Sequence, residues 1–216
     1  MTFKLRLLLL LYTNPSRLFD KIHNTAWCVE MFNDWIDHLK ISSGKSVIDV
    51  GCGPGGLTRN LLSRGVDAVG MDKSERMLKV ARKNAGEDSG ACFINGDVYN
   101  MDFEDGRFDF ALSASLINIV NDPLKAAVEM KRIVKTDGRV CFLAPGEMMT
   151  RKAANRYAMD KRSPKLDREL LELWADKAPS MQEQRLRSLA DEAGLNDIKV
   201  SMLLDGMVVT LSGRKR

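Results

Sequence analysis

The sequence predicts an α/β protein with a mostly parallel β-sheet covered by helices on both faces. Three observations lead to this class. Short apolar segments alternate with amphipathic ones from Ser46 onward, a glycine-rich turn follows the first apolar segment, and an Asp-Gly turn joins the last two. A chain of 216 residues can bury a substantial core as one unit, and no shift in composition marks a boundary. We therefore expect a single domain spanning residues 1–216.

The N-terminal part, residues 1–40, is predicted to be helical, because apolar residues recur there at helical spacing. Thr25 is placed to cap a new helix inside this stretch. Further upstream, Lys4 and Arg6 flank the start of an apolar run, Leu7–Leu11, which is far shorter than the ~20 residues that span a bilayer. We expect a packed helix and no transmembrane segment, with weak peripheral membrane contact as the alternative.

Five short apolar segments are expected to form the parallel strands: Val47–Val50, Ala68–Met71, Ala91–Ile94, Phe108–Leu112 and Val140–Leu143. Lys135–Gly138 is expected to be the turn before the fifth strand. Two later segments, Ile198–Leu204 and Met207–Leu211, flank Asp205-Gly206, which predicts an antiparallel hairpin. The expected sheet therefore has seven strands, with the hairpin at one edge.

Residues 146–180 form an insertion after the fifth strand, with a helix expected at 166–177 and another after it at 182–193. Five of its side chains offer adaptable apolar surface, so we expect the insertion to cover a substrate: Met148, Met149, Tyr157, Met159 and Trp174. Seven basic and two acidic residues between Arg151 and Arg168 give a local net charge of +5. This charge predicts either a solvated helix face or an entrance that attracts an anionic molecule.

The overall composition excludes several classes. A net charge of +4 is too small to indicate a nucleic-acid binder. The four cysteines (Cys28, Cys52, Cys92, Cys141) form no CxxC pair and no metal-ligand spacing with the two histidines, so no metal site is expected. Cys92 and Cys141 lie in apolar runs, where cysteine is usually a small buried hydrophobe. These features favour a reduced, cytoplasmic setting.

The richest segment is Val47-Ile48-Asp49-Val50-Gly51-Cys52-Gly53-Pro54-Gly55-Gly56. It ends a buried strand, opens a helix and satisfies GxGxxG, while Asp72 follows at the end of the second strand, where an acid can bind ribose hydroxyls. By itself this pattern also suits a nicotinamide-dependent dehydrogenase or a tight turn. Asp49 inside the strand, Pro54 in the turn and Asp97 after the third strand instead favour a cationic sulfonium cofactor.

Four successive motifs resemble those of class I S-adenosylmethionine-dependent methyltransferases, closest to the small-molecule and ubiquinone-biosynthesis-like branch. They are Asp49–Gly55, then Gly70–Ser74 with Met77, then Gly96–Val98, then Phe108–Ala111. The resemblance covers about residues 46–145. It implies a Rossmann-like three-layer αβα sandwich with strand order 3-2-1-4-5-7-6 and an antiparallel last strand. It also implies S-adenosyl-L-methionine as cofactor and S-adenosyl-L-homocysteine as product.

The resemblance assigns roles to single positions. It places Gly51, Cys52 and Gly53 under the methionine part of the cofactor, and Asp49 near its ammonium group. It places Asp72, followed by Lys73, at the ribose, Met77 beside the ribose or adenine, Asp97 and Val98 at the adenine edge, and Ser113 at the methionine tail. The acids could also be ordinary helix caps or turn residues.

The catalytic residue is left open. Many relatives carry histidine where this chain has Asn118, so a histidine base at that position cannot be assumed. His23, on the N-terminal helices that are expected to form a lid, is the nearest alternative, and Tyr12 and Trp27 are further candidates to line that lid. For each of these residues simple packing is the competing interpretation.

The expected function is methyl transfer to a small molecule by in-line displacement, which depends mainly on alignment. An RNA or protein methyltransferase and a non-catalytic S-adenosylmethionine-binding subunit are the alternatives. The expected partner is a small-molecule substrate rather than nucleic acid, and the protein is expected to be a monomer or homodimer.

Overall fold

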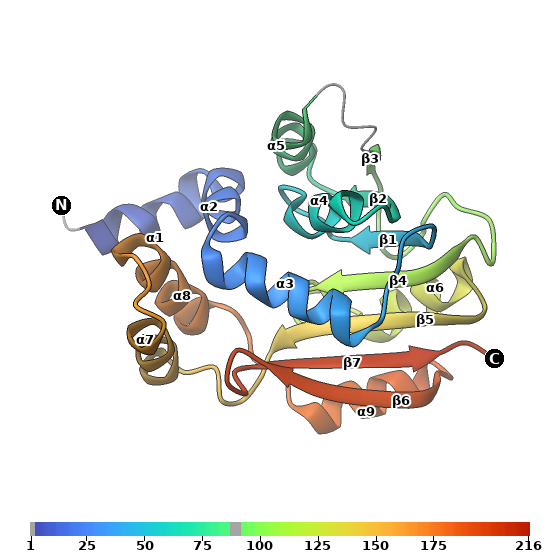
Figure 1. The fold of residues 1–216 in the computed structure, drawn as a ribbon. Helices are drawn as coiled ribbons and strands as arrows, with labels where there is room; N and C mark the ends of the chain where they lie inside the picture. Colours follow the sequence, from blue (N-terminus) through green and yellow to red (C-terminus); the bar gives the residue numbers. More distant parts are fainter. Residues whose placement is uncertain (1–2, 87–91) are drawn as a thin grey trace.

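The computed structural model describes residues 3–86 and 92–216. At its centre is a seven-stranded sheet in the order β3-β2-β1-β4-β5-β7-β6 (Figure 1). The strands are β1 (Ser46–Val50), β2 (Asp67–Asp72), β3 (Cys92–Asn95), β4 (Phe108–Ala114), β5 (Val134–Pro145), β6 (Asn196–Leu203) and β7 (Val208–Arg214). Strands β1 to β5 pair in parallel, and β7 runs antiparallel to β5 and β6. The predicted order is confirmed. Strand β6 forms the edge, and the antiparallel strand β7 lies between β6 and β5.

Two predictions, for Cys92 and for Lys135–Gly138, need correction. Ala91, where the third strand was expected to begin, lies outside the described residues, and Cys92 is exposed because β3 is an edge strand. Lys135–Gly138 is part of β5 rather than a turn before it. There the pairing with β4 shifts in a bulge. The C-terminal Lys215 holds this segment in the sheet, since it exchanges backbone hydrogen bonds of 2.9 Å with Asp137 and Gly138.

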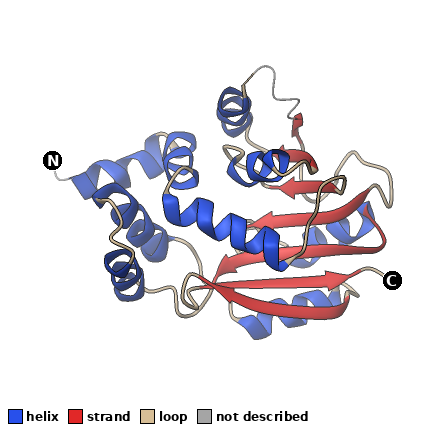
Figure 2. Cartoon of the chain, viewed as in Figure 1, coloured by secondary structure: helices blue, strands red, loops and turns tan. Residues whose placement is uncertain are grey.

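Helices cover both faces of the sheet, as the strand–helix alternation predicts (Figure 2). Val47 packs into a core with α3 (Ala26–His38) and α4 (Gly56–Ser63), and α5 (Glu75–Ala85) lies next to β2 and β3. Ile48 and Val50 pack into the other core, with α6 (Pro123–Ile133) and α9 (Glu183–Glu192). Alternate residues of β1 thus serve opposite faces, which completes the three-layer sandwich.

Four further helices gather beyond the carboxyl ends of β1, β4 and β5 (Figure 1). They are α1 (Phe3–Thr13), α2 (Pro15–His23), α7 (Arg151–Asp160) and α8 (Lys165–Lys177). Helix α8 contacts each of the other three. The N-terminal segment and the insertion therefore meet in space although they are far apart in sequence. In the described part of the chain, no helix is long and apolar enough to cross a membrane.

The predicted helix boundary near Thr25 is confirmed, since Thr25 directly precedes α3. Its hydroxyl nevertheless donates to the Ile22 carbonyl at 2.7 Å rather than capping α3. The break between α2 and α3 lets the chain change direction. As a result, α3 lies along the sheet while the carboxyl end of α2 reaches the glycine-rich turn.

Candidate active site

The glycine-rich turn after β1 forms the floor of the site. Gly51, Gly53 and Gly55 have φ angles of 76°, 53° and 79°, which side chains other than glycine rarely adopt. A Cβ atom on Gly51 would lie only 2.8 Å from Cδ2 of Leu116. The turn therefore needs glycine both for its conformation and for the close approach of its backbone to whatever lies above it.

Asp72, at the carboxyl end of β2, supports this turn. Its Oδ2 accepts a hydrogen bond from the Gly53 N–H at 2.9 Å, and its Oδ1 accepts one from the Ser74 N–H at 2.8 Å. An ionised carboxylate has about four acceptor positions, so about two remain for a ligand. Asp72 can thus shape the loop and bind hydroxyl groups at the same time.

Two pockets meet above this turn, at the carboxyl ends of the strands. The apolar pocket has a volume of about 260 Å³. The polar pocket has a volume of about 230 Å³ and lies over β2 and β3, where Lys73, Gly96, Asp97, Val98 and Tyr99 contribute to its lining. Both are lined by Gly51, Asp72, Leu116 and Ile119. The two pockets are therefore neighbouring halves of one site at the edge where parallel sheets bind ligands.

The polar pocket carries an acid at its rim. Asp97 accepts a hydrogen bond from the Tyr99 N–H at 3.0 Å and pairs with Lys73 at 2.9 Å. The Tyr99 N–H and then the Lys73 cation lower the pKa of Asp97, so its carboxyl group is ionised at neutral pH. An ion pair this exposed adds little stability. The pair therefore lines the pocket with charge and contributes little to folding.

The apolar pocket takes most of its walls from outside the sheet. Its lining includes Phe19, Ile22 and His23 of α2, Trp27, Cys28, Met31 and Phe32 of α3, and Trp174 of α8. Trp27 and Trp174 stack with ring centres 5.5 Å apart, and Trp27 Nε1 donates to the Asp167 carbonyl at 3.0 Å. The stacked pair joins the N-terminal helices to the insertion at the pocket wall.

A third cavity of about 160 Å³, called the side pocket here, extends from the apolar pocket toward α1 and the end of α8. The two cavities have five lining residues in common: Phe19, Ile22, Ser115, Ile119 and Trp174. Leu11, Leu18 and Leu173 make the remainder mostly apolar, and Lys177 is also part of the lining. The site therefore has an apolar extension away from the polar pocket.

His23 lies between the N-terminal helices and the glycine-rich turn. Its Nδ1 accepts a hydrogen bond from the Gly56 N–H at 3.2 Å, and its ring packs edge-on against Phe32 with centres 5.4 Å apart. Burial and the nearby Arg59 cation lower the pKa of His23 to about 4, although Asp20 acts in the opposite direction. The Gly56 hydrogen bond occupies the lone pair that a general base would need.

Asp49 is buried beneath the turn and lines neither pocket. Its Oδ2 accepts a hydrogen bond from the Thr58 hydroxyl at 2.7 Å. Burial raises the pKa of Asp49 to about 7, Thr58 opposes the shift, and the negative charge of Asp72 adds to it. A cation bound near Asp49 would therefore favour the ionised form of its carboxyl group.

Besides Asp49, four residues expected at the site line neither the apolar nor the polar pocket. Tyr12 is 74% exposed on α1 and lines no described cavity. Ser113 is fully buried, and its neighbours Ala114 and Ser115 form the pocket wall instead. The Cys52 side chain packs under the turn in a small apolar cluster. Asn118 lines the side pocket and donates to the Pro179 carbonyl at 2.9 Å, which ties the loop after β4 to the end of the insertion.

The other expected cofactor residues are brought together: Gly51, Gly53, Asp72 and Met77 line the apolar pocket, and Lys73, Asp97 and Val98 line the polar one. The sequence alone did not single out Leu116 and Ile119, which line both pockets, nor Phe19 and Phe32. These are apolar residues in apolar patterns, so no signal distinguishes them from core residues.

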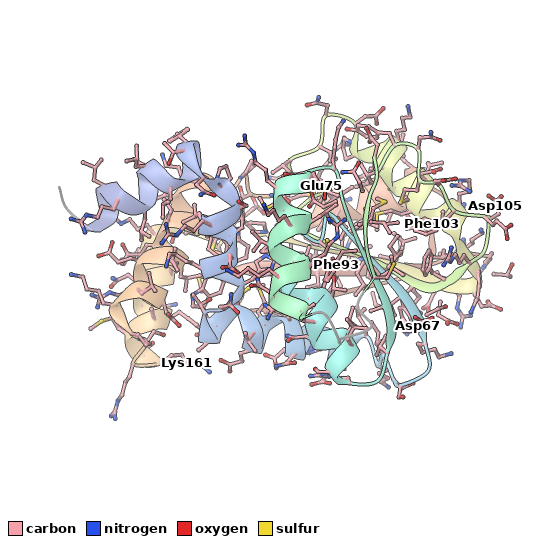
Figure 3. All side chains as sticks on the ribbon, turned by 90° about the horizontal axis from the view of Figure 1, so that it is seen from above. Asp67, Glu75, Phe93, Phe103, Asp105 and Lys161 are labelled. Atoms are coloured by element: carbon pink, nitrogen blue, oxygen red, sulfur yellow. The ribbon has the colours of Figure 1, made fainter. Side chains whose placement is uncertain are left out.

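The insertion contributes less lining than expected. Of its five candidate apolar residues, only Trp174 lines the apolar pocket. Met149 and Tyr157 are buried in the core, whereas Met148 and Met159 are exposed. Its basic residues are partly paired, since Arg151 contacts Glu172 at 3.1 Å and Lys161 contacts Glu30 at 3.0 Å. Lys161 lies at the end of α7, outside the sheet (Figure 3). These pairs favour the solvated-face interpretation of the charge.

Comparison with known proteins agrees with this geometry. Residues 48–142 match the methyltransferase domain family. The demethylmenaquinone methyltransferase of Staphylococcus epidermidis is 26% identical over 94% of this chain and 91% of its own length. The Staphylococcus aureus enzyme of the same name is 25% identical over 94% and 91%.

Solved structures share the fold. Haemonchus contortus phosphoethanolamine N-methyltransferase 2 in complex with S-adenosyl-L-methionine has a TM-score of 0.61 and 18% identity, covering 85% of this chain and 52% of that one. A Methanococcus maripaludis structure, described as an S-adenosyl-L-methionine-dependent methyltransferase, has a TM-score of 0.70 and 20% identity over 93% and 91%.

The Rossmann-like sheet order and the glycine-rich turn with its strand-end acids define a nucleoside-binding α/β enzyme. Together with the matched methyltransferase domain and the relatives, they indicate an S-adenosylmethionine-dependent methyltransferase that is similar to enzymes of the ubiquinone/menaquinone-like branch. The site fits this cofactor. Gly51 has no room for a Cβ atom, Asp72 keeps acceptor positions free for hydroxyl groups, and buried Asp49 favours a cation nearby.

Proposed function

We propose that this enzyme methylates a small, mostly apolar molecule held in the apolar pocket. The observation that carries the proposal is the contact between the two pockets at Gly51, Asp72, Leu116 and Ile119. A cofactor whose adenosine part lies in the polar half would place its sulfonium at this junction, facing an acceptor in the apolar half. Aligning two reactants in this way can lower a barrier by ~7–11 kcal/mol.

The chain's own residues hold the cofactor in this proposal. Asp72 accepts hydrogen bonds from the ribose hydroxyls, and Asp97 with Val98 binds the adenine edge. Gly51 and Gly53 lie under the methionine part, and Asp49 favours its positive charge from below. When bound, S-adenosylmethionine supplies a methyl group already activated by the sulfonium, so strong acid–base help is needed only for an acceptor that must lose a proton.

A quinone-like acceptor fits the lining best. The aromatic and aliphatic side chains of α2 and α3 and the Trp27–Trp174 stack suit a flat apolar ring. The side pocket leaves room for an apolar substituent on that ring. The relatives named demethylmenaquinone methyltransferase support this acceptor class.

We further propose that residues 1–40 form a lid and residues 146–180 a substrate cover on a single domain. Both segments reach the apolar pocket, where Trp27 meets Trp174. Segments that open for exchange come from the less stable parts of a fold. Such a cover would exclude water from the acceptor when it is closed.

The test is methyl transfer from labelled S-adenosylmethionine to a panel consisting of reduced demethylmenaquinone, phosphoethanolamine, total RNA and denatured protein. Label in the organic extract with the quinol supports the proposal. Label in RNA or protein would overturn the small-molecule acceptor. Cofactor binding in calorimetry without transfer to any of the four would favour a non-catalytic subunit.

A further inference from the structure

His23 places a polar ring in the wall of a mostly apolar pocket, and its contacts define which edge faces the cavity. A Cβ atom on Gly56 would lie 2.7 Å from His23 Nδ1 and 2.8 Å from His23 Cβ, so that edge faces the turn. A Cβ atom on Gly53 would meet Cε1 at 3.8 Å. His23 is part of the pocket lining, and Nε2 is the ring nitrogen that these contacts do not turn toward Gly56.

The hydrogen bond from Gly56 determines where the ring carries its proton. A backbone N–H can only donate, so Nδ1 must be the unprotonated acceptor in this 3.2 Å contact. A neutral imidazole then carries its proton on Nε2. Within residues 3–86 and 92–216, Nε2 has no hydrogen-bond partner. The pocket wall thus presents an N–H donor that protein atoms leave unused.

The donor is held in place on several sides. Phe32 packs against the ring at 5.4 Å between centres. The end of α2 is tied to the body of the enzyme by Asn84 Nδ2 donating to Asp20 at 2.7 Å and by Arg59 donating to Asn24 at 3.3 Å. A donor fixed in this way can select a ligand by geometry, because little of its freedom is lost on binding.

We propose that His23 is a specificity-determining residue whose Nε2–H donates a hydrogen bond to an oxygen atom of the methyl acceptor. The acceptor class is then an apolar ring that carries a carbonyl or hydroxyl oxygen. This inference rests on the proposed small-molecule function and assigns His23 a role in recognition rather than in proton removal. A site built to donate to an oxygen discriminates strongly against an analogue that lacks one.

Equilibrium dialysis of the full chain, saturated with S-adenosylhomocysteine, can test this. The probes are 2,3-dimethyl-1,4-naphthoquinone and 2,3-dimethylnaphthalene, which share a ring system and differ in the two oxygens. Methyl groups at both ring positions block addition of thiols such as Cys28. Because the hydrocarbon gains more from leaving water, the informative quantity is the quinone-to-hydrocarbon affinity ratio compared between variants. The Nε2–H donor should raise this ratio in the wild type by about tenfold or more, the value of one good hydrogen bond.

His23→Phe should lower the quinone-to-hydrocarbon affinity ratio by about tenfold while keeping affinity for the hydrocarbon within about threefold. His23→Gln, which retains an N–H donor, should restore part of this ratio. The matched control is His38→Phe, because His38 is exposed on α3 and bonds the Asp34 carbonyl on its own helix. The affinity ratio should stay constant from pH 6 to pH 9, where neutral His23 does not titrate.

The outcomes separate the two proposals. An unchanged quinone-to-hydrocarbon affinity ratio in His23→Phe overturns the role of His23 and leaves the proposed function standing. An affinity ratio that titrates between pH 6 and pH 8 also overturns it. If neither probe binds, the apolar acceptor class itself is wrong, and this inference is wrong with it.

Discussion

Replacing Asp49 with asparagine should make the enzyme more stable and a weaker binder of its cofactor. Asp49 is 1% exposed, and its one side-chain hydrogen bond in the described structure comes from Thr58. Asparagine keeps the size of the side chain and an oxygen that can accept from Thr58, but it cannot ionise. The variant therefore removes a buried charge with little change of shape.

The magnitude follows from the pKa of Asp49, which burial raises from 3.8 to about 7. Between these values the folded state binds a proton that the unfolded state has lost, so the free energy of unfolding falls as pH rises. At ~1.4 kcal/mol per pKa unit, the full loss is about 4 kcal/mol, of which about 3 kcal/mol falls between pH 4.5 and pH 8.5. Asp49→Asn should therefore raise the free energy of unfolding by about this amount at high pH and by much less at low pH.

Urea unfolding of the wild type and of Asp49→Asn at pH 4.5 and pH 8.5 measures the effect. Asp109→Asn is the control, because it should change the free energy of unfolding in the opposite direction. Despite desolvation, hydrogen bonds from Ser46 and the cation of Lys135 lower the pKa of Asp109 to about 2. Ionised Asp109 thus stabilises the fold at neutral pH, and its removal should destabilise. If Asp49→Asn raises the free energy of unfolding equally at both pH values, the linkage argument is refuted.

Asp49→Asn should also weaken S-adenosylmethionine binding by ~10-fold or more, the usual effect of losing an interaction with a charged group. Calorimetry at pH 8.5 gives the dissociation constants. Unchanged affinity would show that the charge of Asp49 does not act on the cofactor. Stability and cofactor binding would then be independent at this position.

Three shorter predictions follow from the site. Asp72→Ala should weaken S-adenosylmethionine binding by ~1–3 kcal/mol in calorimetry, and unchanged affinity would show that Asp72 does not bind the ribose. Gly51→Ala should lower the melting temperature and cofactor affinity, because it forces a side chain to φ 76° and a Cβ to 2.8 Å from Leu116; wild-type values for both would contradict the role of the turn. Trp174→Leu, which removes the stack on Trp27, should raise the acceptor KM in steady-state kinetics and change cofactor affinity less than about threefold; the reverse pattern would place Trp174 on the cofactor side.

Much of the fold follows from local patterns. Alternating apolar strands and amphipathic helices predict a parallel sheet wherever they occur, and the Asp205-Gly206 turn predicts the hairpin. Because parallel strands share one carboxyl edge, the positions of Asp72 and Asp97 at strand ends already predict that they meet at one site. These features depend on neighbours in sequence, so one sequence suffices to predict them.

Contacts between distant segments could not be predicted in this way. The hydrogen bond between His23 and Gly56 depends on how α2 is tied to the body of the enzyme, and the Trp27–Trp174 stack depends on where the insertion returns. Apolar periodicity shows that Trp27 is buried, but a pocket wall and a core have the same pattern. Tyr12 shows a related error. The sequence predicts its helix, but it does not predict that the Tyr12 side chain lies on the exposed face of that helix.

The sequence by itself determined the order of strands and helices, the conformation of the glycine-rich turn and the chemistry of the cofactor. Tertiary structure alone decided which side chains face the pocket, as Ser113 shows. Successive residues of a strand point to opposite faces, so an error of one residue at the end of β4 exchanges a buried hydroxyl for the pocket wall at Ala114. The residue at which a strand gives way to a loop depends on packing against distant helices, and this packing is not encoded in the local pattern.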